Sequence, residues 1–227
     1  MPRVQLQFYA CLCAYLIIQL LEIPEIWGSR LLDKLRFFQA RMTQEYSLAH
    51  WIDRILDENS GQLYLHFGSS YKTSDFRVDN LQSWWTILPN LEQQERQLIQ
   101  LKIDNGLESS GIRTQFLKRI VDFSDEIGRP IQILHYPPYH SKYNPIERCW
   151  GVLEQHWSGT LLQDIQTLLG WAQSMTWKGI HPKVWLNSKT YKKGISLSKQ
   201  EMRDVEDRLE RNPELPKWDI LIQPANR

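Results

Sequence analysis

The sequence LIQLKIDNG, residues 98–106, joins a short apolar strand directly to an acidic turn. Leu98–Ile103 has the composition of a strand, and the Asp-Asn-Gly that begins at Asp104 favours a tight turn. We therefore expect a carboxylate at the carboxyl end of a strand. The next segment predicts a helix that ends at Gly128, just before Pro130. The residues expected to face inward on this helix are Ile112, Phe116, Leu117, Ile120, Val121 and Ile127.

Strands and helices alternate around this stretch. Leu63–Phe67 has the alternation of a half-buried strand, and Ile131–Leu134 is a further strand. After the first of these, Thr73 and Ser74 can cap a helix. Its apolar residues recur at helical spacing: Leu81, Trp84, Trp85 and Leu88. This order of elements indicates an α/β layer with parallel strands.

A second carboxylate, Glu147, stands at the start of another helix. The sequence Asn-Pro-Ile-Glu from Asn144 supplies an N-cap residue, a proline in the first turn and a glutamate three residues after the cap. The apolar stripe of this helix is Ile146, Trp150, Leu153 and Trp157, and Glu147 lies outside it. One carboxylate thus ends a strand, and another begins a helix that follows a stiff, proline-containing loop.

Asp104 and Glu147 are candidate ligands of a divalent cation. Mg²⁺ prefers carboxylate oxygens, and phosphodiester chemistry with two metal ions requires carboxylates from separate elements to converge. Each residue also has a purely structural interpretation, Asp104 as a turn residue and Glu147 as the returning arm of a capping box. The spacing alone leaves both interpretations open.

A wider set of motifs resembles one protein family. The Asp104 turn, Ser109-Ser110-Gly111 and the segment from Tyr136-Pro137-Pro138 to Asn144-Pro145-Ile146-Glu147 are similar to bacterial insertion-sequence transposases of the DDE superfamily. The closest resemblance is to the Rhodopirellula-type family. Three further segments, Gly68–Val78, Tyr191–Ile195 and Trp218–Pro224, extend the resemblance over residues 56–224.

The resemblance implies an α/β fold with an RNase H-like mixed sheet flanked by helices. It also implies a D, D, E metal triad in which Asp104 is the second Asp and Glu147 is the Glu. The family's first Asp lies on the first strand of the sheet. We assign no residue to it, because Asp57 falls in a hairpin turn, and Asp33 and Asp53 lack strand context.

We therefore expect a sheet that lacks its first strand, as in an N-terminally truncated or frameshifted copy. Residues 1–55 are then a non-matching segment, helical or disordered, and residues 56–224 are a partial catalytic domain. The resemblance further implies a DNA transposase that uses Mg²⁺ or Mn²⁺ to cleave phosphodiesters and transfer strands between transposon ends and target DNA. Without the first Asp, we expect this chain alone to have little strand-cleavage activity.

Two other hypotheses remain open at this stage. The chain is a non-catalytic nucleic-acid-binding or interfering remnant of a transposase, or it is an unrelated α/β protein in which Asp104 and Glu147 are a turn residue and a cap. The expected partners are DNA and either further copies of this chain or an intact transposase.

Several basic residues are candidate DNA contacts. His135, Lys142 and Arg148 lie close in sequence to the acidic motifs. Lys192 and Lys193 belong to a segment from Lys178 to Lys199 that holds six lysines and no acidic residue. Such a segment can follow a DNA backbone or simply form a solvated surface.

Composition restricts the class of protein without identifying it. Lys and Arg number 27 against 26 Asp and Glu, so a DNA-binding surface has to be local. Three cysteines do not form a disulfide framework, which favours the cytoplasm. The apolar run Phe8–Ile23 contains Gln19 and Glu22 and is shorter than a membrane-spanning helix requires. We therefore expect no membrane association.

Overall fold

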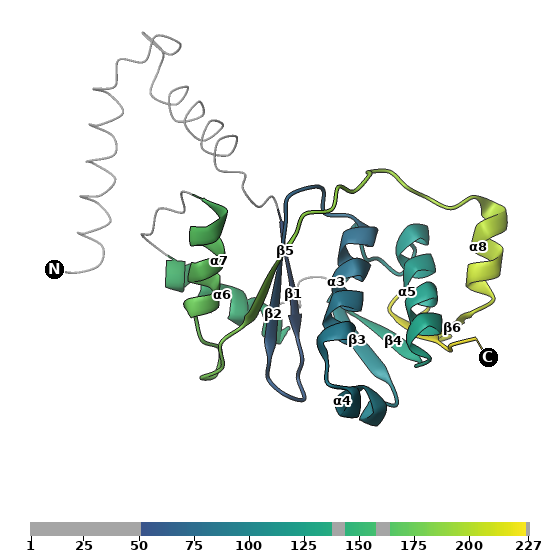
Figure 1. The fold of residues 1–227 in the computed structure, drawn as a ribbon. Coiled ribbons are helices and arrows are strands. Elements are labelled where there is room, and N and C mark those ends of the chain that lie inside the picture. The colour runs from purple at the N-terminus through teal and green to yellow at the C-terminus, as the bar shows by residue number, and fades with distance from the viewer. Residues whose placement is uncertain (1–50, 138–143, 158–163, 226–227) are drawn as a thin grey trace, which may run out of the picture. The chain divides into compact units, whose positions relative to one another are not determined.

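The computed structural model describes residues 51–137, 144–157 and 164–225. These residues form a mixed α/β fold with two mixed sheets flanked by helices (Figure 1). The elements in chain order are β1 (Trp51–Leu56), β2 (Leu63–Gly68), α3 (Ser74–Ile87), α4 (Asn90–Glu95), β3 (Ile99–Asp104), α5 (Thr114–Ile127), β4 (Ile131–Tyr136), α6 (Pro145–Trp157), α7 (Ile165–Ser174), β5 (Lys183–Asn187), α8 (Lys199–Glu206), β6 (Leu209–Arg211) and β7 (Asp219–Ile222). The apolar run Phe8–Ile23 and Asp33 lie outside the described residues.

The first sheet has the order β1-β2-β5. Strand β2 pairs antiparallel with β1 and parallel with β5. It is buried along its whole length, and not half-buried as the alternation predicted. The reason is that both faces carry a core: Tyr64 packs with α3, whereas Leu65 and Phe67 pack with α6 and α7. Figure 1 shows the sheet between these two groups of helices.

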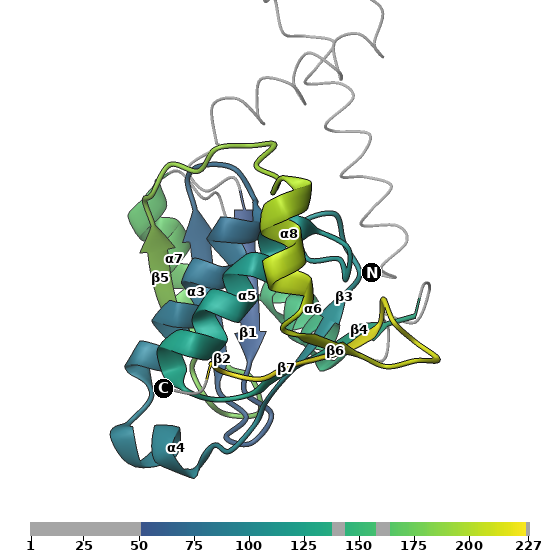
Figure 2. The ribbon, with the colours of Figure 1, turned by 90° about the vertical axis from the view of Figure 1, so that its right-hand side faces the viewer.

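The second sheet has the order β3-β4-β7-β6. Strands β3 and β4 are parallel, as predicted, and β7 pairs antiparallel with both β4 and β6. Helix α5 buries Phe116, Leu117 and Ile120, and α8 lies beside it (Figure 2). Ile112, predicted to face inward, precedes the helix and is 64% exposed.

The fold class agrees with the mixed α/β layer expected from the sequence. The expected sheet is divided, however, into two sheets. The division falls between β1 and β3, the edge strands of the first and second sheet, because no described strand pairs with both.

Two expectations about residues 51–55 are wrong. The sequence pattern assigned them to a helical or disordered segment, but they form most of β1. Asp53 therefore has strand context and pairs in register with His66 of β2. Pairing along the whole of β2 outweighs the mixed local pattern of these residues. Asp57 follows β1 in the hairpin turn, as predicted.

The helix boundaries follow from local chemistry. The side chain of Thr73 accepts a hydrogen bond from the backbone N–H of Phe76 and begins α3. Gly128 ends α5 in the left-handed conformation, with a φ of 62°. Among the described residues, no helix is both long enough and apolar enough to cross a bilayer.

Candidate functional site

A cavity of about 380 Å³ lies between the edge strands of the two sheets. Its walls include residues 52–59, which cover β1 and the turn after it, and residues 98–104, which cover β3. The start of α6, residues 144–147, closes another side. Asp104 and Glu147, which the sequence places 43 positions apart, therefore face the same cavity.

Asp104 is exposed at the end of β3, and the loop after it is tightly held. The backbone carbonyl of Asp104 accepts hydrogen bonds from the Gly106 N–H at 2.8 Å and from the Ser109 hydroxyl at 3.2 Å. His135 Nε2 donates to the Ser109 carbonyl at 2.8 Å. Within the described part of the chain, no hydrogen bond or ion pair engages the Asp104 carboxylate, which is therefore available to a ligand.

Close backbone packing explains why the Ser-Ser-Gly motif of this loop ends in a glycine, Gly111. A Cβ atom at Gly111 would lie 2.2 Å from the backbone carbonyl oxygen of Lys217, a contact that no larger residue can make. The Arg211 guanidinium donates to the Gly111 carbonyl at 3.0 Å. The loop that follows Asp104 is thus packed directly against the segment leading into β7.

Glu147 lies in the first turn of α6. Asn144 is buried and accepts a hydrogen bond from the Ile146 N–H at 3.2 Å, so it caps the helix as the sequence predicted. The Glu147 carboxylate points toward Arg54 of β1, with Nη2 and Oε1 3.7 Å apart. The Arg54 guanidinium also lies 4.8 Å from the centre of the Trp150 ring. Sequence reasoning missed Arg54, because β1 was not recognised as a strand.

Two ion pairs join the turn after β1 to β3 and to the residues before it. Asp57 lies 2.5 Å from Arg96, and Glu58 lies 2.6 Å from Lys102. Asp53, a further carboxylate in the cavity wall, accepts a hydrogen bond from the Asn80 amide at 3.2 Å. In the described ranges, no group of three His, Cys, Asp or Glu side chains is close enough to hold a metal ion.

The donor set suits a hard cation only in part. Asp104 and Glu147 offer the one or two carboxylates with which Mg²⁺ is commonly held, and water and phosphate oxygens complete such a site. Arg54 places a positive charge beside Glu147, and this charge opposes the binding of a metal cation at that carboxylate.

The basic candidates have different surroundings. His135 is 7% exposed, and burial lowers its pKa, so the expectation that it contacts phosphate is wrong: it fixes the Ser109 carbonyl instead. Arg148 is exposed on α6. Lys192 and Lys193 are exposed in the segment between β5 and α8, with Lys193 4.0 Å from the centre of the Tyr71 ring. Lys142 lies outside the described residues.

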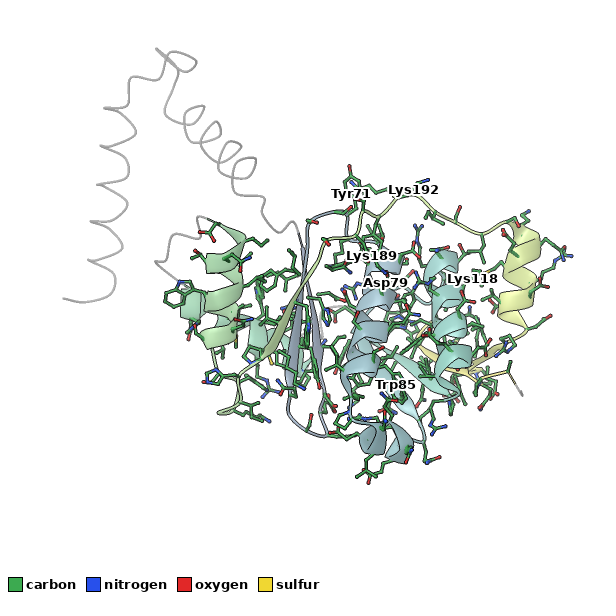
Figure 3. The ribbon with its side chains drawn as sticks, in the orientation of Figure 1. Tyr71, Asp79, Trp85, Lys118, Lys189 and Lys192 are labelled. Carbon is green, nitrogen blue, oxygen red and sulfur yellow. The ribbon has the colours of Figure 1, made fainter. Side chains whose placement is uncertain are left out.

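The segment that carries Lys192 and Lys193 is tied to the same end of the fold as the Asp104 loop. Tyr191 N–H donates to the Ser70 hydroxyl at 3.0 Å, and Arg113 donates to the Ile195 carbonyl at 3.1 Å. Ser74, at the start of α3, donates to the Glu108 carbonyl of the Asp104 loop at 2.7 Å. Figure 3 shows Tyr71 and Lys192 together beyond one end of α3, whereas Trp85 lies near the other.

Lys189 has a structural role. Its ammonium lies 2.8 Å from Asp79 of α3, which also receives hydrogen bonds from Arg119 of α5 and from the Tyr191 hydroxyl. Burial alone would raise the pKa of Asp79, but these three hydrogen bonds outweigh burial and lower it. Lys189 therefore holds its segment to α3 (Figure 3).

Comparison with known proteins points to one family. A family model described as "Rhodopirellula transposase DDE domain" matches residues 49–224. A Synechocystis protein named "Putative transposase for insertion sequence element IS4SA" is 49% identical over 47 residues, which are 21% of this chain and 14% of that protein. The chain thus matches only a small part of that relative's length. No solved structure matches.

Proposed function

Since the chain belongs to the family of Rhodopirellula transposase DDE domains, we propose that it takes part in the phosphoryl-transfer reactions of DNA transposition. The observation that carries the proposal is the cavity into which Asp104 and Glu147 both face. Two carboxylates that come from a strand end and a helix start, and meet at one cavity, support a site for phosphodiester chemistry.

In this proposal, Asp104 and Glu147 hold a Mg²⁺ or Mn²⁺ ion. The bound ion stabilises the negative charge on the attacking and leaving oxygens of the phosphodiester. Asp104 is oriented by its loop, which the Ser109–His135 hydrogen bond fixes to β4. Arg54 lies beside the Glu147 carboxylate and competes with the cation for it.

We propose further that strand cleavage by this chain alone is weak. Of the other carboxylates in the cavity wall, Asp57 and Glu58 are paired with Arg96 and Lys102, and Asp53 is hydrogen-bonded to Asn80. None of them forms a metal-binding group of three within the described residues. A single site with two carboxylates, one of them paired with arginine, holds a cation less firmly than a complete triad.

The proposed DNA contacts are Lys142, Arg148, Lys192 and Lys193. The exposure of the last three supports contacts with phosphates, which supply most of the sequence-independent affinity of DNA-binding proteins. The proposed compartment is the cytoplasm, where bacterial DNA lies.

The test uses a DNA duplex that carries the element ends flanking this gene. We expect the full chain to bind this duplex in EDTA and to cleave it only slowly in Mg²⁺ or Mn²⁺. Rapid cleavage that Asp104→Ala abolishes would contradict the weak activity while supporting the role of Asp104. Failure to bind this duplex or an unrelated one would contradict the proposal as a whole.

A second candidate function is interference with an intact transposase of the same family. The Arg54–Glu147 ion pair favours this second function, because the guanidinium charge of Arg54 offsets the charge of the Glu147 carboxylate without disturbing the fold. An excess of this chain is then expected to lower strand transfer by the intact enzyme. If the two proteins compete for the same DNA, Arg148→Ala is expected to weaken this inhibition. Inhibition that is independent of DNA concentration would instead indicate that the two proteins pair with each other.

A further inference from the structure

Tyr71 differs in exposure from the other aromatic side chains that the structure describes. It is 48% exposed, whereas every other Phe, Trp or Tyr among these side chains is buried or half-buried. It lies in the loop between β2 and α3, and Figure 3 shows it beyond the end of that helix. Exposed aromatic rings are the platforms on which proteins stack unpaired nucleic-acid bases.

A positive charge lies against this ring. The Lys193 ammonium is over the face of the Tyr71 ring, 4.0 Å from its centre. This contact favours one orientation of the ring, and about half of the residue stays open to solvent. Lys192, the neighbour of Lys193, is exposed at the same end of the fold (Figure 3). A ring that can receive a base is therefore adjacent to ammonium groups that can receive phosphates.

Tyr191, the residue before the two lysines, holds their segment in place. It is buried, its ring meets the edge of the Phe76 ring with the centres 5.6 Å apart, and its hydroxyl donates to Asp79 at 2.9 Å. The Tyr191 N–H donates to the hydroxyl of Ser70, the residue before Tyr71, at 3.0 Å. Because the two loops are joined directly, less conformational freedom is lost when a ligand binds to both.

The exposed ring and the lysines are also joined to the Asp104 loop. Ser74, three residues after the ring, donates to the Glu108 carbonyl of that loop at 2.7 Å. Arg113, at the end of the loop, donates to the Ile195 carbonyl, two residues after the lysines, at 3.1 Å. A DNA strand bound at the ring can therefore continue to the Asp104 loop.

The charge at this end of the fold favours a polyanion. Asp75 and Asp79, in the first turns of α3, are both paired with Arg119 at 2.7 Å. Within the described residues, neither Lys192 nor Lys193 has an ion-pair partner. Single-stranded DNA matches both features of the surface, because it combines a chain of phosphates with flat base faces that are open to stacking.

We propose that Tyr71 stacks on an unpaired base of a bound DNA strand while Lys192 and Lys193 hold the adjacent phosphates. The surface then prefers single-stranded DNA, or a duplex end that has opened, to a fully paired duplex, in which neighbouring bases cover the base faces. This inference rests on the proposed function, since it takes DNA as the substrate. It adds the state of that DNA, which is unpaired beside the Asp104 loop.

The test compares binding of the full chain to a labelled oligothymidine and to a blunt duplex, by fluorescence anisotropy in EDTA. Tyr71→Leu removes the ring, and we expect it to weaken single-strand binding about tenfold and duplex binding less than about twofold. Tyr71→Phe is the matched control, because it keeps the ring and loses only the hydroxyl. Its affinity for the single strand is expected to stay within about twofold of the wild type.

Photocrosslinking tests the contact itself. On irradiation, 5-iodouracil loses its iodine and bonds to an aromatic ring that is stacked on it. A single strand that carries this base is expected to label Tyr71, which mass spectrometry of the digested protein identifies.

Three outcomes would overturn the proposal. They are labelling only at other residues, unchanged single-strand affinity in Tyr71→Leu, and equal losses of single-strand and duplex affinity in that variant. If the wild type still binds the duplex in any of these cases, the proposed function stands without the stacking. Failure of the wild type to bind either DNA would contradict both.

Discussion

Asp104 and Glu147 have opposite surroundings although they line the same cavity. The Asp104 carboxylate is exposed at a strand end, whereas Glu147 lies beside the Arg54 guanidinium. Sequence could identify both residues, because each stands at a recognisable boundary between elements. It could not identify Arg54, since the charge of a residue does not reveal which strand or helix it will face.

Replacing Arg54 is expected to strengthen cation binding. In Arg54→Met the aliphatic stem that packs near Trp150 is largely kept, and the positive charge beside Glu147 is lost. Because both groups are partly exposed, we expect the affinity for Mn²⁺ to rise by only about threefold to fivefold, equivalent to about 1 kcal/mol. Electron paramagnetic resonance of free Mn²⁺ measures this change.

Arg148→Met is the matched control for that experiment. It removes the same charge from an exposed site on α6 outside the cavity wall. An equal gain in Mn²⁺ affinity in both variants would show that net charge, and not the Arg54–Glu147 pair, controls binding.

His66 is expected to make the stability of the fold depend on pH. It is 2% exposed and stacks on Trp185, and burial lowers its pKa to about 4. Unfolded chains bind a proton at this residue below about pH 6.5, but the folded protein does so only near pH 4. The stability that neutral His66 contributes is therefore complete above about pH 6.5 and is lost as the pH falls toward 4.

Urea unfolding of the wild type and His66→Phe measures this contribution. Between about pH 7 and pH 5, we expect the wild type to lose about 2 kcal/mol more of its free energy of unfolding than the variant loses. His135 titrates in the same direction in both proteins, so the difference isolates His66. Parallel pH profiles would contradict the assignment.

At the scale of elements, the sequence predicted those strands and helices whose boundaries depend on local chemistry. The strand before Asp104, the capped start of α3 and the glycine end of α5 are examples. β1 was missed because its six residues are held by pairing with β2 and have no clear alternation of their own. The division into two sheets could not be predicted either, since it depends on which strand edges find partners.

A substitution at Gly111, with one at Gly170 as its control, tests how the Asp104 loop is positioned. Gly111→Ala forces a Cβ atom against the Lys217 carbonyl, and we expect it to destabilise the fold by about 3 kcal/mol and to displace the loop. Gly170→Ala, in an exposed position of α7 with open space around it, is expected to stabilise by about 0.5–1 kcal/mol. Urea unfolding compares the two variants, and similar effects in both would contradict the packing described for Gly111.

At the scale of the whole molecule, DNA affinity has to come from a local surface, because the net charge is only +1. The lysine segment predicted from the sequence is not uniformly available for this purpose. Lys189 is paired with Asp79, whereas Lys192 is exposed near the end of the fold that carries the Asp104 loop. Sequence could show the run of lysines but not which of them have internal partners.

The salt dependence of DNA binding tests this surface. If Lys192 and Lys193 each neutralise one phosphate, the double alanine variant reduces the slope of log K against log salt by about 1.8 on duplex DNA. Lys118→Ala, on α5 and paired with Asp122, is the control and is expected to leave the slope nearly unchanged. Fluorescence anisotropy with a labelled duplex measures both slopes, and an unchanged slope in the double variant would exclude this segment from the contact.

The central claim is that Asp104 and Glu147 form one cation site. The most direct test of it is cleavage of the polypeptide by Fe²⁺ bound in place of Mg²⁺, with hydrogen peroxide as the oxidant and ascorbate to return Fe³⁺ to Fe²⁺. Hydroxyl radicals cut the backbone only near the bound ion. We predict cuts close to both residue 104 and residue 147, which disappear together in Asp104→Asn and also in Glu147→Gln, and persist in Asp53→Asn. Cuts at only one of the two positions, or cuts near one that survive substitution of the other, would contradict the claim.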